Sequence, residues 1–214
     1  MIIRRATLKD SGKIALIHFL AEKGKVGFFS KMNIDFFNSY YSIILSCPTE
    51  LVICAEYSDG IRGFAHMTFN STYQMAYIKR YFAKLIIPLL KAIVASPSSF
   101  KIIFNRALSS ILRKKAAAFF SSSLVRGCYW GWHPAKKEPL ASIELYNHQF
   151  KILKDRNIER MDFEVDNDST FMYQFHTMNG ARVMSESILQ DGRKRFFMYY
   201  DILSVTKEPK ERRF

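Results

Sequence analysis

The pattern of hydrophobic and polar positions predicts a chain that alternates between strands and helices. Short apolar or alternating runs are typical of strands, and they occupy residues 2–6, 51–57, 61–69, 127–132, 160–165, 181–187 and 195–203. Apolar side chains at helical spacing predict helices over residues 8–22, 34–45, 139–155 and 169–178. The resulting order is β-α-α-β-β, then an insert, then β-α-β-α-β-β.

Local turn and cap signals support this order. Residues 58–60, Ser-Asp-Gly, separate the second and third predicted strands, and an Asp-Gly pair supplies the positive φ angles of a tight hairpin. Residues 190–192 predict a second hairpin turn near the end of the chain. Thr7 and Asp10 have the spacing of an N-terminal cap, so we expect the first helix to begin there.

The insert, residues 71–125, has a helical pattern of its own. Along residues 73–94 one helical face is apolar and the opposite face is basic; the apolar face holds Ile78, Phe82, Leu85, Leu89 and Ile93, and the basic face holds Arg80, Lys84 and Lys91. Pro88 predicts a kink or a break in this segment. A turn at residues 96–99 and a second helix over 100–120 complete a predicted helical hairpin, whose apolar runs are too short and too charged to span a bilayer.

The net charge of +13 belongs to one region of the chain. No acidic residue lies between Asp59 and Glu138, and this stretch holds 13 Lys and Arg residues. A basic surface attracts phosphates whatever its role, but these basic residues sit on hydrophobic helices and no recognised nucleic-acid motif accompanies them. We therefore expect no nucleic-acid partner.

Several uses fit a basic amphipathic insert. Its apolar face could pack on its own domain beneath a solvated basic face. The helical hairpin could instead cover an acceptor site, bury against a second subunit in a homodimer, or lie on an anionic membrane surface. The sequence leaves these alternatives open.

Composition sets the size and setting of the fold. With 214 residues, of which 49% are hydrophobic, the chain can bury a full core, so we expect a single α/β domain over residues 1–214 with a flexible tail at 205–214. The first five residues lead directly into a strand pattern rather than a signal sequence, which predicts a cytoplasmic protein. Cys47, Cys54 and Cys128 are odd in number and widely spaced, which indicates reduced core thiols and no metal site.

Four short segments, in their order and spacing, carry a resemblance to a known family: residues 3–10, 52–56, 61–65 and 178–182. They are similar to the first strand and helix start, the second and third strands, and the late helix-to-strand junction of the GNAT superfamily of acyl-CoA-dependent N-acyltransferases. The resemblance covers residues 2–70 and 127–203. It implies an α/β (α+β) fold with a mixed, mostly antiparallel sheet flanked by helices, and it places the insert between the third and fourth strands.

The family's coenzyme A loop has a counterpart after the fourth predicted strand. The family's loop begins at a proline and continues with a basic residue or Gln, then any two residues, then Gly, then any one residue, then Gly or Ala. The backbone N–H groups of this loop hold the pyrophosphate of coenzyme A. Counting from Pro134 places Lys137 at the basic position but Leu140 and Ser142 at the two glycine positions. The resemblance implies cofactor contacts at Trp130, Trp132, Lys136, Lys137, Leu140, Ala141, Ser142 and Ile143.

Acyl transfer to an amine needs a base for the acceptor and an acid for the leaving thiolate. The resemblance implies an acid four residues before Gly180, where the family often has Tyr and this chain has His176; Tyr173, one turn earlier, is the substitute donor. Glu164, near the end of the fifth predicted strand, and His133, at the end of the fourth, are candidate bases. The competing interpretations are a helix histidine without a role, a core aromatic residue and a solvated carboxylate.

Together these expectations favour an enzyme that moves an acetyl or other acyl group from coenzyme A directly to an amine of a small molecule, an amino sugar or a peptide. The lost glycines and His176 keep two alternatives open. One is a catalytically inactive GNAT-like binding or structural protein. The other is a membrane-surface acyltransferase that acts on a lipid-linked amine at the inner face of the membrane.

Overall fold

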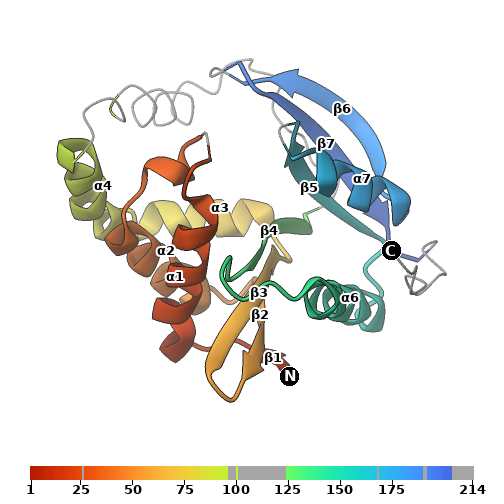
Figure 1. The fold of residues 1–214 in the computed structure, drawn as a ribbon. Coiled ribbons are helices and arrows are strands. Elements are labelled where there is room, and N and C mark those ends of the chain that lie inside the picture. Colours follow the sequence, from red (N-terminus) through yellow and green to blue (C-terminus); the bar gives the residue numbers. More distant parts are fainter. Residues whose placement is uncertain (26, 96–99, 101–123, 168, 190–191, 204–214) are drawn as a thin grey trace.

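A seven-stranded sheet runs through the computed structural model, which describes residues 1–25, 27–95, 100, 124–167, 169–189 and 192–203 (Figure 1). Its strands are β1 (Ile2–Arg5), β2 (Glu50–Tyr57), β3 (Gly60–Thr68), β4 (Arg126–Trp132), β5 (Arg160–Asp166), β6 (Arg182–Ile188) and β7 (Lys194–Asp201). They lie in the order β1-β2-β3-β4-β5-β7-β6. All neighbours are antiparallel except β4 and β5, which are parallel.

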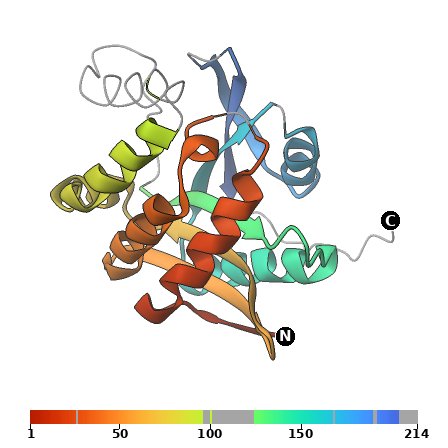
Figure 2. The same cartoon turned by 60° about the vertical axis from the view of Figure 1, so that its left-hand side comes forward.

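Helices cover both faces of this sheet (Figures 1 and 2). Within the described residues they are α1 (Ser11–Glu22), α2 (Ile34–Ser46), α3 (Ser71–Arg80), α4 (Ala83–Ala95), α6 (Pro139–Asp155) and α7 (Thr170–Met178), with short 3-10 turns at Leu8–Asp10 and Phe29–Lys31. Helices α1, α2 and α4 share one core with the sheet, and α6 and α7 share the other. The predicted mixed sheet flanked by helices is confirmed.

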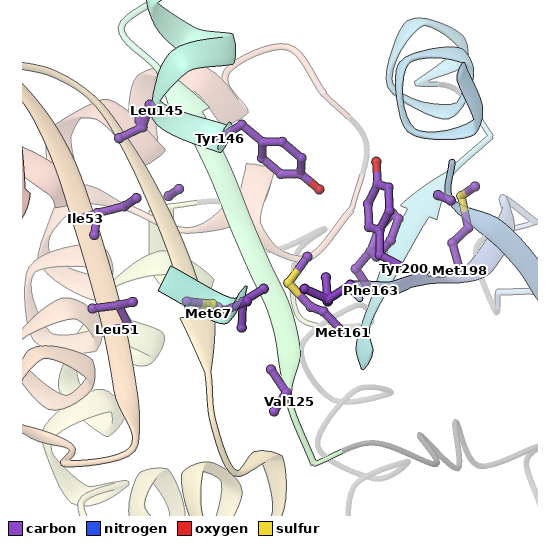
Figure 3. Packing of buried hydrophobic residues seen from close by; sticks show 14 of the residues in the cluster. Leu51, Ile53, Met67, Val125, Leu145, Tyr146, Met161, Phe163, Met198 and Tyr200 are labelled. Carbon is purple, nitrogen blue, oxygen red and sulfur yellow. The ribbon is translucent and has the colours of Figure 1, made fainter. Parts of the chain in front are cut away.

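Strand alternation divides the apolar side chains between two cores. Successive side chains of a strand point to opposite faces, so Val52 and Cys54 of β2 join the core under α1 and α2. Leu51 and Ile53, from the same strand, join the core under α6 (Figure 3). Each fully buried aliphatic side chain contributes about 1.5–3 kcal/mol relative to exposure, so both helical layers are bound firmly to the sheet.

Local signals in the sequence correctly located the first elements. Gly60 has a φ angle of 111° at the start of β3 and pairs with Tyr57 across the predicted hairpin. The Asp10 carboxylate accepts the Thr7 backbone N–H at 2.8 Å, which fixes the start of the first helical segment. Residues 190–191 of the second predicted turn lie outside the described residues.

The insert differs from its predicted form in one respect. Residues 73–94 form two helices rather than one, and the break falls at Tyr81 and Phe82, not at Pro88. Pro88 lies inside α4, where its missing N–H removes one helical hydrogen bond. It is buried against α2, and its carbonyl accepts Nδ2 of Asn33 at 3.2 Å, so packing offsets that loss.

Two further predictions for the insert lie outside the described residues: the turn at 96–99 and, except for residue 100, the second helix. The predicted C-terminal tail at 205–214 lies outside them as well. Among the helices that the structure describes, none combines the length and apolarity needed to cross a bilayer.

A buried polar cluster fastens α3 to the sheet. Gln74 of α3 donates from Nε2 to Glu50 of β2 at 2.6 Å, and the same carboxylate oxygen lies 2.6 Å from Nε2 of His66 on β3. Nε2 of Gln74 also lies 3.5 Å from Sγ of Cys128 on β4. A buried carboxylate is stable only when hydrogen-bonded, so the insert and three strands depend on one another here.

Replacing Gln74 by Ala should lower the free energy of unfolding by about 1–3 kcal/mol, because it removes a donor from a buried carboxylate. Urea unfolding followed by circular dichroism measures this change. Met75→Ala, one residue further along α3 and exposed, is the matched control and should cost less than about 0.5 kcal/mol. Equal stability of the Gln74 variant and the natural protein would show that the cluster does not anchor α3.

Candidate active site

Strands β4 and β5 part from one another after a single pair. Their register pairs only Arg126 with Asp162, and the Asp162 N–H donates to the Val125 carbonyl at 3.1 Å. No further pair follows between these two strands, although β4 continues to Trp132. Parallel strands normally form a continuous ladder. Here β4 and β5 part beyond the first pair, and this parting leaves one edge of β4 without a neighbouring strand among the described residues.

The backbone alternation of β4 determines which residues face this free edge. The His133 N–H donates to the Arg62 carbonyl of β3 at 2.7 Å, so the backbone of His133 faces β3. Backbone N–H and C=O groups alternate in direction along a strand. Those of Trp132 and Trp130, one and three residues earlier, therefore face away from β3 and toward the parting. They form an open strand edge of the kind that pairs with an extended amide-containing chain.

The start of α6 lies directly after this edge. Pro139 is the first helical residue, and the Ser142 N–H makes the first helical bond, to the Glu138 carbonyl at 2.9 Å. The N–H groups of Leu140 and Ala141 therefore have no carbonyl partner within the helix. Free N–H groups and the helix dipole make such a helix start attractive to anions.

Solved structures share this fold over nearly the whole chain. The protein yncA of Salmonella typhimurium, solved with its cofactor acetyl-CoA, superposes with a TM-score of 0.57 at 13% identity, over 94% of each chain. A GNAT-family acetyltransferase from Streptococcus pneumoniae gives 0.55 at 9% identity, over 93% of this chain and 97% of that one. The N-acyl amino acid synthase FeeM from uncultured soil microbes gives 0.55 at 8% identity, over 96% and 98%. No protein-family model and no curated protein matches the sequence.

The chain has the GNAT fold. Identities this low establish the architecture alone. The predicted place of the insert, between the third and fourth strands of the GNAT sheet, is also confirmed, because α3 and α4 lie between β3 and β4 in the chain.

Ion pairs engage most of the charged side chains around residues 133–138, the loop that joins β4 to α6 and that the sequence predicts to bind the cofactor. The Glu138 carboxylate accepts the Tyr57 hydroxyl at 2.5 Å and is bound by Arg62. Arg62 also binds Asp59, and Nζ of Lys136 lies 2.7 Å from the same aspartate. The hydrogen bonds from Lys136 and Arg62 lower the pKa of Asp59 to about 2.

Of the two lysines in this loop, Lys136 is paired with Asp59 and Lys137 is the one that can bind an anion. Lys137 is exposed, and no ion pair within the described residues engages it. The carbonyl of Lys136 is held by Nε1 of Trp132 at 2.6 Å, which fixes the loop against β4. His133 accepts the Ala135 N–H on Nδ1 at 3.3 Å, so this candidate base shapes the loop turn.

An aromatic cluster fills the space behind the parting on the side of α6 and α7. The Trp130 ring lies 4.7 Å from Tyr146 of α6 and 5.2 Å from Phe175 of α7, measured between ring centres. Figure 3 shows Tyr146 and Tyr200 pointing toward one another across this region. Within the described residues, Nε1 of Trp130 is buried without a hydrogen-bond partner, so the cluster leaves one polar group available.

His176 lies inside this cluster rather than at its surface. Its Nδ1 is 3.0 Å from the Tyr200 hydroxyl and 3.3 Å from the Tyr146 hydroxyl. Burial lowers the pKa of His176 to about 3, because an apolar setting disfavours the charged ring. A neutral imidazole at physiological pH does not suit a general acid.

Tyr173, the other predicted acid, has a different setting. It is half-buried on α7, with its ring 4.6 Å from that of Phe196. Within the described residues, the Tyr173 hydroxyl forms no hydrogen bond, so it remains able to donate its proton.

Glu164, the predicted base, belongs to a salt-bridge network. Arg126 binds its Oε1, and Arg195 donates to its Oε2 at 2.6 Å. The neighbouring Asp166 is bound by Arg195 and Arg193. Because both oxygens of Glu164 are engaged by guanidinium groups, this carboxylate is committed to holding β4, β5 and β7 together.

A second carboxylate lies near β4 on the side of α1. The Tyr129 hydroxyl donates to Oε1 of Glu22 at 3.0 Å, and Nζ of Lys25 lies 2.9 Å from the same oxygen. His18 stacks on the Tyr129 ring at 3.6 Å and is held by the Tyr41 hydroxyl at 2.7 Å from Nδ1. The sequence offers no local signal for Glu22, because its partner Tyr129 lies on a strand far along the chain.

One cluster elsewhere has the side chains of a metal site. Possible ligand atoms of Glu50, His66 and Cys128 lie within 4.8 Å of one another. All three already take part in the hydrogen bonds that anchor α3, and burial raises the pKa of the Cys128 thiol to about 12. We therefore regard the cluster as structural, and a protein without a metal stays our prediction.

Burial of His176 predicts a pH dependence of stability. Its pKa falls from 6.5 to about 3 on folding, so below about pH 6.5 the unfolded chain binds a proton that the folded chain does not. Stability should therefore be intact above pH 6.5 and decline by about 1.4 kcal/mol per pH unit as the pH falls toward 3. His176→Phe should remove this contribution, as measured by urea unfolding between about pH 4.5 and 7.

His148→Gln is the matched control, because this half-buried histidine lies on α6 outside the aromatic cluster. It should keep the pH profile of the natural protein. Parallel profiles for the natural protein and the His176 variant would contradict the buried neutral state.

Proposed function

We propose that the protein is an acyl-CoA-dependent N-acyltransferase that moves an acetyl or longer acyl group directly to an amine. The observation that supports this most is the free edge of β4, which leads into the anion-attracting start of α6 within a GNAT fold. The neighbours support both donor and acceptor classes, since yncA was solved with acetyl-CoA and FeeM is an N-acyl amino acid synthase.

The donor site fits coenzyme A in two places. The amides of its pantetheine arm can pair with the outward backbone groups of Trp130 and Trp132, as a strand would. Its pyrophosphate can accept from the N–H groups of Leu140 and Ala141, with Lys137 beside them. Pro139 has no N–H and Leu140 replaces a glycine, so this phosphate site has fewer donors and less room than the family's pattern.

The two proton transfers of the reaction use residues on opposite faces of the sheet, one on the side of α1 and one on the side of α7. Acyl-CoA supplies a thioester, whose C–S bond is replaced by a C–N bond to the amine. We assign Glu22, whose Oε2 makes no hydrogen bond within the described residues, to accept the proton of the attacking amine. We assign the Tyr173 hydroxyl to protonate the departing thiolate, and keep Glu164, His133 and His176 as positioning residues.

A catalytically inactive binding protein with the GNAT fold is the second candidate function. The negative Glu138 at the start of α6 favours it, because a carboxylate there repels phosphate and holds Arg62. The neutral His176 favours it as well. We expect either protein in the cytoplasm.

Titration calorimetry with acetyl-CoA tests the donor site. Lys137→Glu should weaken binding by about 3- to 10-fold, because it places a negative charge beside the phosphates. Glu138→Gln should strengthen binding by a similar factor, because it removes one negative charge and releases Arg62. Lys13→Glu, an exposed residue of α1, is the matched charge control. A folded natural protein that does not bind millimolar acetyl-CoA would overturn the enzyme proposal.

Steady-state kinetics with a panel of amines test the proton transfers. Glu22→Gln and Tyr173→Phe should each lower kcat by about 10²- to 10⁴-fold and leave KM for the acyl donor nearly unchanged. Glu144→Gln on α6 and Tyr73→Phe on α3, both exposed, are the matched controls. If acetyl-CoA binds and no amine consumes the thioester, the inactive binding protein is the better description.

A further inference from the structure

Helix α4 carries a second apolar face in addition to the one it buries. Leu85, Pro88 and Ala92 are buried against α2. On the outside, five large apolar side chains are exposed to solvent: Phe82 (46%), directly before the helix, and Ile86 (44%), Ile87 (66%), Leu90 (56%) and Val94 (81%) within it. We call these five side chains the outer face of α4. A helix that is apolar on nearly all sides belongs in a core or at a membrane, and the described residues cover only one side.

Helical geometry gathers these side chains into one continuous surface. Phe82, Ile86, Leu90 and Val94 are spaced four residues apart, so they form one row along the helix, with Ile87 beside it. Lys84 and Lys91 are two turns apart and border this row on one edge. Figure 2 shows α4 on the outside of the helical layer. Within the described residues, this surface is uncovered along the length of the helix.

Uncompensated positive charge borders the outer face. Lys79, Arg80 and Lys84 have no carboxylate partner among the described residues, and no acidic residue lies between Asp59 and Glu138 in the chain. Lys91, which pairs with Asp35 at 2.8 Å, is the exception. Whatever covers the apolar face must also accept these cations.

An aromatic ring accompanies two of these cations where α3 meets α4. It belongs to Tyr81, whose ring centre lies 4.8 Å from that of Tyr77. Arg80 and Lys84 both lie over the Tyr81 ring, at 5.8 and 5.3 Å from its centre. Tyrosine and long basic side chains concentrate at the boundary between lipid tails and headgroups, where their apolar stems are buried and their polar ends meet water.

Charge distinguishes the possible occupants. A second copy in a two-fold dimer would place the same patch against itself, and α3 and α4 contain no acidic residue that could meet the partner's cations. An anionic lipid surface satisfies both requirements, because its phosphates accept the cations while its tails cover the apolar row. We propose that the outer face of α4 docks the protein on an anionic membrane surface. This docking requires no catalytic step and stands apart from the proposed function.

Vesicle co-sedimentation of the full chain tests the proposal. The protein should bind vesicles of phosphatidylcholine with about one-third phosphatidylglycerol at least tenfold more tightly than vesicles of phosphatidylcholine alone. Raised salt should weaken binding to the anionic vesicles, because it screens the lysines and arginines.

Variants then locate the binding surface. Ile87→Glu combined with Val94→Glu should reduce vesicle binding at least tenfold, and Lys79→Gln combined with Lys84→Gln should reduce it several-fold. Ile188→Glu is the matched control, because this side chain on β6 is 77% exposed and lies far from α4 in the chain. The control should bind as the natural protein does. Circular dichroism should show that all variants remain folded, as their exposed positions lead us to expect.

Three outcomes would overturn the proposal. The first is that the natural protein binds neither kind of vesicle. The second is that the double glutamate variant keeps full vesicle binding, which would place the contact elsewhere. The third is a dimer in sedimentation that the same variant dissociates, with no vesicle binding, which would make a second copy the occupant of the outer face.

Discussion

The single pair between the parallel strands β4 and β5 is the constraint on which the candidate site depends. The bond from Asp162 to the Val125 carbonyl joins the two strands at one end. Beyond it, no strand in the described part of the chain pairs with the outward backbone groups of Trp130 and Trp132. If the ladder continued, the sheet would gain hydrogen bonds, but no edge would remain for an extended ligand. The site therefore exists because the sheet is incomplete at this point.

Different interactions hold the parting open on its two faces. On the side of α6 and α7, aromatic rings around Trp130 and His176 fill the space between the helices. On the other face, Arg195 ties Glu164 to Asp166. Aromatic packing excludes water, which keeps His176 neutral, whereas the salt bridges fix the directions of the strands. The same two features make His176 a poor acid and Glu164 a poor base, so we look for these roles in Tyr173 and Glu22.

What could be predicted from the sequence depends on how local the cause is. The β2–β3 hairpin follows from adjacent Asp59 and Gly60. The order of strands and helices along the chain follows from periodicity, and the mixed, mostly antiparallel sheet follows from the family resemblance. The kink or break predicted at Pro88 falls instead at Tyr81 and Phe82, because packing on α2, with a hydrogen bond from Asn33, keeps that proline inside a helix. The pairing of Glu138 with Arg62 and of Tyr129 with Glu22 joins residues distant in the chain. No periodic pattern signals such contacts.

The fold also separates basic residues that the sequence presents as one group. Arg62, Arg126 and Lys136 all lie in the stretch without acidic residues, yet each binds a carboxylate from outside it. Their charge serves to join β3, β4 and the loop before α6 to the rest of the sheet. The cations on α3 and at the start of α4 receive no such partner within the described residues. Positive charge that the fold does not compensate must be met by solvent or by another anionic surface, and here it borders an apolar face that solvent does not favour.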